Sequence, residues 1–83
     1  MGNCLAAVRV VPTPVDGRTL VVNCADNGRV LLVDARTLNV THEIQVGTLP
    51  IGIAGPDDRF AYAANMADDT ISVIDIRRGI VVR

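Results

Sequence analysis

Few side chains in this sequence are of types that do chemistry, and their spacing brings no catalytic set together. His42 is the only histidine, and its neighbours Thr41, Glu43 and Gln45 are typical of an exposed outer strand. A nucleophilic site needs a base that converges with a Ser, Thr or Cys in a cleft. The sequence predicts no such arrangement, and we expect His42 to be a surface side chain.

Two acidic pairs, Asp57–Asp58 and Asp68–Asp69, have the composition of metal ligands or of general acid–base groups. Both fall in segments that read as turns, where Asp is common because it accepts local backbone hydrogen bonds. The sequence holds no calcium-binding loop, and one histidine with two distant cysteines makes no zinc set. We therefore predict no catalytic residue, no metal site and no cofactor in this chain.

The two cysteines, Cys4 and Cys24, could in principle form a disulfide. If they lie on the first two strands of one sheet, the hairpin turn near Val15 places Cys24 opposite Ala7. Cys4 would lie three residues from Ala7 along the same strand. The Cα atoms of Cys4 and Cys24 would then be more than the roughly 7 Å apart that a disulfide spans. The sequence therefore predicts two buried free thiols.

Size and composition allow one small unit and indicate no charged partner. The chain has 83 residues, of which 49% are apolar, and a net charge of −1. All eight cations are arginines spread along the chain, so we expect neither a basic patch nor nucleic-acid binding. No apolar run approaches the roughly 18 residues of a membrane span, and Arg9 interrupts the only stretch resembling a signal peptide. The sequence does not indicate the cellular compartment of the protein.

The apolar pattern predicts strands throughout and no helix. Apolar residues do not recur at helical spacing, whereas short β-branched runs alternate with turn residues. Asn27-Gly28 is a strong hairpin signal, and Asp34 and Asp75 should accept backbone hydrogen bonds just beyond their strands. Tyr62 lies in an apolar run and is expected in the core. The predicted strands cover residues 5–11, 19–24, 29–35, 40–46, 50–54, 60–65, 70–76 and 79–82.

The pattern repeats after 41 residues, which indicates stacked structural units. The Asp-Gly-Arg turn at 16–18 has its counterpart at 57–59, and the strand 29–34 has its counterpart at 70–75. Repeats of this length, made of strands and cut by turns, are typical of β-propeller blades. Residues 30–33 are apolar throughout, as expected for a strand covered on both faces.

The second copy resembles the YVTN-type β-propeller repeat. It carries Gly-x-x-Pro-x-Gly-Ile-Ala at 47–54, Pro-Asp-Asp-Arg at 56–59, Tyr-Ala-Ala-Asn at 62–65 and Asp-Thr-Ile-Ser-Val-Ile-Asp at 69–75. In this copy Asp58 replaces the turn glycine of the family pattern, and Ala63 replaces a valine. The first copy fits less closely, with Cys24 in place of the family asparagine.

The resemblance implies an all-β fold of two consecutive four-stranded antiparallel blades that do not close into a ring. Residues 1–47 would form the first blade and residues 48–83 the second, with a truncated outer strand. Family members usually have about seven blades, and many are exported. Loops between second and third strands often rim the channel of a propeller, so Met66, Asp68 and Asp69 form the candidate contact loop.

Two blades leave apolar faces bare, because repeat units bury their faces only against neighbours. Three hypotheses follow: a fragment of a larger YVTN-like propeller acting as a non-catalytic binding or scaffold surface, part of an enzymatic propeller, or a module that assembles into a ring of copies. Enzymatic relatives would resemble haem d1 nitrite reductases, quinohaemoprotein amine dehydrogenases or lactonases, with the active site in other blades. The expected partners are further blades or copies of the chain.

Overall fold

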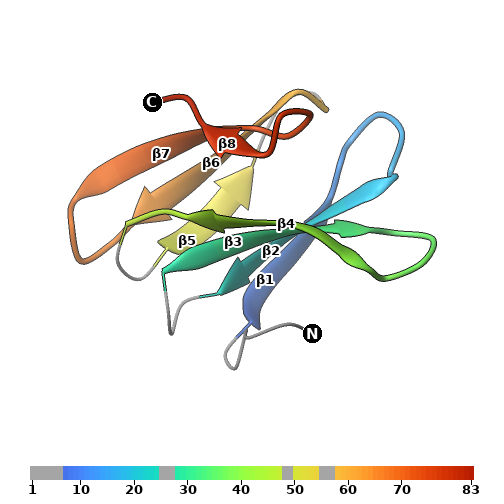
Figure 1. Cartoon of the computed structure of the whole chain (residues 1–83). Coiled ribbons are helices and arrows are strands. Elements are labelled where there is room, and N and C mark those ends of the chain that lie inside the picture. The colour runs from blue at the N-terminus through green and yellow to red at the C-terminus, as the bar shows by residue number, and fades with distance from the viewer. Residues whose placement is uncertain (1–6, 25–27, 48–49, 55–57) are drawn as a thin grey trace.

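The protein folds as two open β-sheets, here described from a computed structural model that covers residues 7–24, 28–47, 50–54 and 58–83. Within these ranges the chain forms eight strands and no helix (Figure 1). The strands form two four-stranded antiparallel sheets, each in sequence order. The predicted all-β class is confirmed. The first sheet contains β1 (Ala7–Pro12), β2 (Thr19–Cys24), β3 (Arg29–Asp34) and β4 (Val40–Gln45), and the second contains β5 (Pro50–Ala54), β6 (Phe60–Asn65), β7 (Thr70–Asp75) and β8 (Ile80–Val81).

Predicted and observed strand bounds agree closely, with the largest differences at the two edges. Strand β1 extends to Pro12, which an edge strand tolerates because its outer N–H groups need no partner. Gly79, predicted to begin the last strand, instead lies in the preceding turn with φ +69°. Leu5, predicted to begin the first strand, falls outside the described residues.

The 41-residue repeat also appears in the backbone conformation of the turns. Gly28 and Asp69 occupy matching positions with φ of 66° and 58°, and Leu38 and Gly79 match with 62° and 69°. This left-handed conformation costs a non-glycine residue roughly 1–2 kcal/mol. Of each matched pair, one position is a glycine and the other is a residue that adopts the left-handed conformation at a cost.

Aspartates close the turn after the third strand of each sheet, as the sequence predicts. The Asp34 carboxylate accepts the N–H groups of Arg36 at 2.8 Å and Thr37 at 3.3 Å. In the second sheet the Asp75 carboxylate accepts the N–H of Arg78 at 3.1 Å. Both interactions stop the strand, because they supply turn hydrogen bonds in place of the ladder.

The two sheets pack with opposite faces in contact. We call the side of the first sheet that carries Val21, Val30 and Leu32 its forward face, and the opposite side its rear face. In the second sheet, residues 41 positions later define the same two faces. The forward face of the first sheet packs on the rear face of the second (Figure 1). The shared core consists of Val21, Val30, Leu32, Ile44, Ala61, Ala63, Ile74 and Ile76.

The outer faces of the pair differ in exposure. On the rear face of the first sheet, Val22, Leu31 and Val33 are buried, so β3 is covered on both sides as predicted. On the forward face of the second sheet, Ile71 is 65% exposed and Tyr62 is 36% exposed. The expectation that Tyr62 belongs to the core is therefore wrong, because no described segment covers that face.

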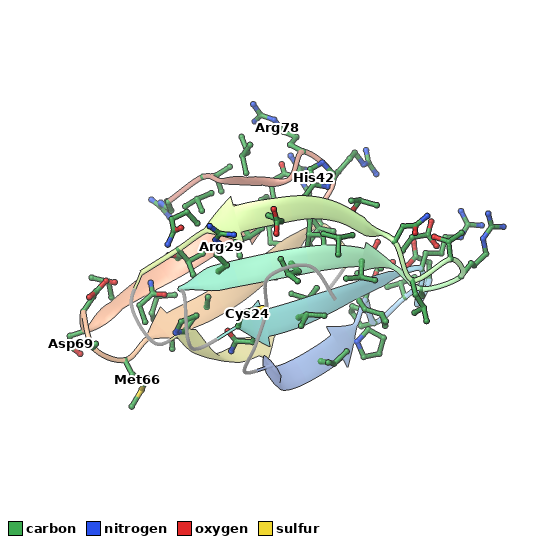
Figure 2. The ribbon with its side chains drawn as sticks, turned by 60° about the horizontal axis from the view of Figure 1, so that its bottom comes forward. Cys24, Arg29, His42, Met66, Asp69 and Arg78 are labelled. Carbon is green, nitrogen blue, oxygen red and sulfur yellow. The ribbon has the colours of Figure 1, made fainter. Side chains whose placement is uncertain are left out.

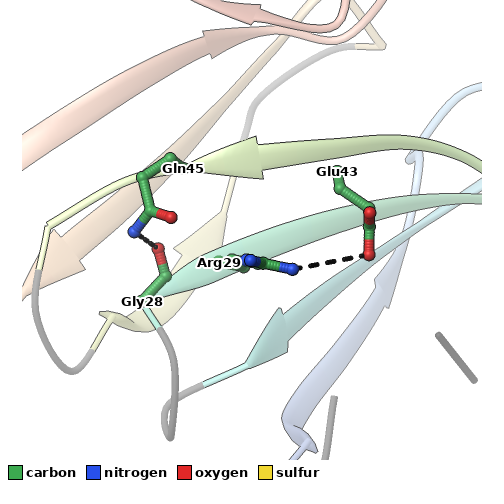
Figure 3. A network of polar contacts seen from close by, with 4 residues as sticks. All are labelled: Gly28, Arg29, Glu43 and Gln45. Carbon is green, nitrogen blue, oxygen red and sulfur yellow. Dashed lines mark hydrogen bonds and ion pairs between the residues drawn. The ribbon is translucent and has the colours of Figure 1, made fainter. Parts of the chain in front are cut away.

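Polar contacts along β3 and β4 fix one edge of the first sheet. Gln45 donates its side-chain amide to the carbonyl oxygen of Gly28 at 2.9 Å, and Arg29 lies 3.8 Å from the carboxylate of Glu43 (Figure 3). Exposed ion pairs contribute at most about 1 kcal/mol. The hydrogen bond from Gln45 is the more informative contact, because it ties the end of β4 to the turn that precedes β3.

Inside the same sheet, the amide of Asn23 is buried, and neither its nitrogen nor its oxygen has a hydrogen-bond partner. A buried polar group without a partner costs about 1–3 kcal/mol. The matching position of the second sheet is Ala64, so the repeat does not require this amide.

Cys24 is disulfide-bonded, which corrects the prediction of free thiols. The predicted pairing of Cys24 with Ala7 is confirmed. The prediction depended on the position of Cys4 along the first strand, and Cys4 lies outside the described residues.

Replacing Leu38 with glycine should raise the free energy of unfolding by about 1 kcal/mol. The substitution relieves the left-handed strain, and Leu38 is 61% exposed, so little burial is lost. Urea unfolding monitored by circular dichroism measures the change. Arg36→Gly, in the same turn at an ordinary φ, should instead lower stability. Equal effects of the two variants would contradict the strain assignment.

Candidate functional site

Asn65 holds the candidate contact loop, residues 66–69, through its backbone carbonyl and fixes the strand that follows through its side chain. Asn65 is 2% exposed and ends β6. Its amide nitrogen donates to the hydroxyl oxygens of Ser72 at 2.9 Å and Thr70 at 3.3 Å. Its backbone carbonyl accepts the N–H groups of Asp68 and Asp69 at 3.1 and 2.9 Å. One buried residue thus sets both ends of the loop.

The same asparagine connects the loop to the segment that joins the two sheets. The N–H of Gly47 donates to the side-chain oxygen of Asn65 at 3.1 Å. A Cβ at Gly47 would lie 2.5 Å from an oxygen of Asp68 and 2.6 Å from the Asn65 side chain, so only glycine fits. Met66 is 63% exposed and projects from the same end of the second sheet as Asp69 (Figure 2). A contact role for Met66, Asp68 and Asp69 stays a prediction.

A polar cleft of about 330 Å³ lies between the sheets at the opposite end. His42 lines it and is exposed, as the sequence predicts. The Thr41 hydroxyl donates to the Leu32 carbonyl at 3.0 Å, so its oxygen accepts from Nδ1 of His42 at 3.2 Å. The imidazole also lies against Gly79, where a Cβ would overlap it. His42 therefore acts as an inter-sheet contact. The lining residues are Asp16, Thr19, Leu32, Thr41, His42, Asp58, Ile76 and Arg77.

Asp58 joins the two sheets at this cleft. Its two carboxylate oxygens accept the N–H groups of Val15 at 2.7 Å and Asp16 at 2.9 Å. Charge-assisted hydrogen bonds of this kind are stronger than neutral ones. The sequence placed Asp58 in a turn where the family repeat has glycine, and nothing local indicated that its side chain binds the loop of the other sheet.

Three arginines from two segments of the sequence meet at the second sheet. Arg59, Arg77 and Arg78 line a pocket of about 370 Å³ together with Asp75. The expectation of arginines without a cluster is therefore wrong for these three. The sequence indicated this basic pocket only through the adjacent arginines Arg77 and Arg78. The pairing of β6 with β7 is what brings Arg59 beside them.

Backbone hydrogen bonds lower the pKa of two aspartates in the first sheet. The N–H of Arg18 and the hydroxyl of Thr13, both donating to Asp16, hold the pKa of that carboxyl below its usual value. The N–H groups of Arg36 and Thr37 do the same for the pKa of Asp34. A donated hydrogen bond favours the charged form of a carboxyl group. These carboxylates stabilise turns, and neither is poised to exchange protons near neutral pH.

Within the described ranges, no three His, Cys, Asp or Glu side chains gather closely enough to hold a metal ion. A helix long and apolar enough to cross a membrane is likewise absent from that part of the chain. The arrangement offers one exposed histidine in a mixed-charge cleft, an anchored contact loop and a basic pocket.

The fold of this chain is similar to part of a longer protein of known structure. No protein-family model matches the sequence, and no curated protein matches it. A solved structure entitled Kuenenia stuttgartiensis Hydrazine Synthase is similar, with a TM-score of 0.88 and 33% sequence identity. The match covers 98% of this chain and 23% of that one. The chain therefore spans less than a quarter of the length of the protein it resembles.

Replacing Asn65 with alanine should lower the free energy of unfolding by about 3 kcal/mol. The variant loses side-chain bonds to Gly47, Thr70 and Ser72, and buried partners left unsatisfied cost about 1–3 kcal/mol. Chemical denaturation measures the loss. Met66→Ala, on the exposed part of the same loop, should change stability by less than about 0.5 kcal/mol. A comparable loss in both variants would show that Asn65 does not anchor the loop.

Acid should destabilise the protein through Asp16 and Asp34. Their pKa values are lower in the folded chain than the usual 3.8, so unfolding takes up protons in acid. Their stabilising effect is complete above that value and is lost as the pH falls through the folded-state pKa. Asp34→Asn should therefore make the free energy of unfolding depend less steeply on pH below about pH 4. Urea titrations across this range test it, and an unchanged slope would refute the assignment.

Proposed function

We propose that this chain is a pair of consecutive β-propeller repeat units and serves as a non-catalytic binding or scaffold segment of a larger propeller. The motifs that resemble the YVTN repeat and the head-to-tail packing of the two sheets support this function. The turns at Gly28 and Leu38 and their counterparts Asp69 and Gly79 repeat the same backbone conformation after 41 residues. Residues 1–47 and 48–83 are the two proposed units.

The observation that carries the proposal is the bare forward face of the second sheet. On the first sheet, Val21 and Val30 are 3% and 0% exposed because the second sheet covers them. Their counterparts Tyr62 and Ile71 are 36% and 65% exposed. The forward face is thus covered in the first sheet and exposed in the second. We infer that it accepts the rear face of a following unit, since repeat proteins bury such faces against neighbours.

A following repeat unit fits this face better than a second copy of the chain. A copy would have to present a rear face, yet Val22, Leu31 and Val33 on the rear face of the first sheet are already buried. The rear face of the second sheet is occupied by the first sheet. A ring built from several copies is accordingly the weaker candidate.

The similarity to hydrazine synthase supports both a larger parent and a second candidate function. A match that covers 98% of this chain and 23% of that one is what a segment of a longer protein gives. Because that protein is named as an enzyme, the alternative is a non-catalytic segment of an enzymatic parent, with the reacting groups elsewhere. The disulfide bond of Cys24 suits an exported parent, since disulfides persist in oxidising compartments.

The proposal predicts opposite responses at two matched positions. Ile71→Glu should change the free energy of unfolding of this chain by less than about 0.5 kcal/mol and reduce binding of a hydrophobic dye. Val30→Glu, at the equivalent position of the first sheet, should prevent folding, because it buries a charge.

Adding a third unit provides the decisive comparison. In a chain lengthened by a second copy of residues 43–83 after Arg83, Ile71→Glu should cost at least about 3 kcal/mol, because the new sheet covers Ile71. Urea unfolding of both chains measures the difference. A lengthened chain that folds but tolerates Ile71→Glu would overturn the proposal.

A further inference from the structure

The basic pocket of the second sheet is assembled by backbone pairing between two segments. The N–H of Ile76 donates to the carbonyl of Arg59 at 2.8 Å, which holds Arg59 beside the end of β7. The turn then folds back, with the N–H of Gly79 on the carbonyl of Asp75 at 2.8 Å. Arg77 and Arg78 lie in this turn. These three arginines thus line one pocket of about 370 Å³.

The pocket carries an excess of positive charge in a chain whose net charge is −1. Three arginines and one aspartate line it, which gives +3 − 1 = +2. Asp75 is 5% exposed, and its carboxylate already accepts the N–H of Arg78, so it is held inside the turn. Among the described residues, no carboxylate forms an ion pair with Arg77 or Arg78. Arg78 projects outward from the turn (Figure 2).

The position of Arg59 is further fixed by its neighbour, because its guanidinium carbon lies 5.0 Å from the centre of the Phe60 ring. A cation over an aromatic ring at this distance is held by the ring's electrostatic field. The pocket therefore has one positioned guanidinium at its edge and two on a short turn. Guanidinium groups match the oxygens of phosphate in paired hydrogen bonds.

We propose that this pocket binds a phosphate group, free or on a small monoester. A compact dianion would offset positive charge at the pocket and accept hydrogen bonds from the exposed guanidinium groups of Arg77 and Arg78. The first sheet provides a comparison within the chain, because the counterparts of Arg59, Arg77 and Arg78 are Arg18, Arg36 and Thr37. With one arginine fewer, that site has a smaller excess of charge and binds phosphate less tightly.

A titration of the full chain with inorganic phosphate tests the proposal. Backbone amide signals of Arg78 and Gly79 are followed by two-dimensional NMR, with sodium chloride at equal ionic strength as the reference. We expect saturable shifts with phosphate alone. Arg77→Gln together with Arg78→Gln should weaken the affinity at least about tenfold, since each removes charge-assisted hydrogen bonds. Arg36→Gln, the matched change in the first sheet, should leave the affinity unchanged.

A second titration with glycerol phosphate distinguishes the two sources of the group. Tighter binding than inorganic phosphate supports a monoester, and equal binding supports the free ion. Two results overturn the proposal: the absence of saturation at concentrations well above about 1 mM, or equal shifts in the doubly substituted and Arg36→Gln chains. Arg77 and Arg78 are exposed, and circular dichroism verifies that the variants fold.

Discussion

The contact of the forward face of the first sheet with the rear face of the second holds this molecule together. In this core, large side chains of the first sheet such as Val30 and Leu32 pack with the small Ala61 and Ala63 of the second. Burying a valine or leucine contributes roughly 1.5–3 kcal/mol. Three further features depend on this contact, because they join parts of the two sheets: the cleft lined by His42, the hydrogen bonds from Val15 and Asp16 to Asp58, and the hydrogen bond from Gly47 to Asn65.

The two sheets meet the same backbone constraints with different side chains. Cys24 and Asn65 stand at the same position, at the end of the second strand of their sheets. Cys24 is tied by a disulfide, whereas Asn65 is tied by hydrogen bonds to Gly47 and to its own loop. In each sheet, the interaction holds the end of the second strand in place, just before the turn that follows it. A structural unit can therefore keep its conformation while individual side chains change.

Strands and turns were predictable because their causes are local. Runs of β-branched residues favour strands, and Asp34 and Asp75 mark turns through contacts with N–H groups two or three residues away. The candidate contact loop was also placed correctly between its strands. Predictions failed where they depended on distant segments. The exposure of Tyr62, the disulfide of Cys24 and the meeting of Arg59 with Arg77 follow from sheet packing and pairing.

The sequence by itself determined the all-β class, the 41-residue period and nearly all strand bounds, because hydrophobic period and turn chemistry act within a few residues. Only the tertiary structure decided which apolar face is covered and which is bare. The strands of both sheets are similarly apolar, so their composition cannot distinguish Val30 from Ile71. Burial depends on the presence of a neighbouring sheet, and that is a property of three-dimensional arrangement.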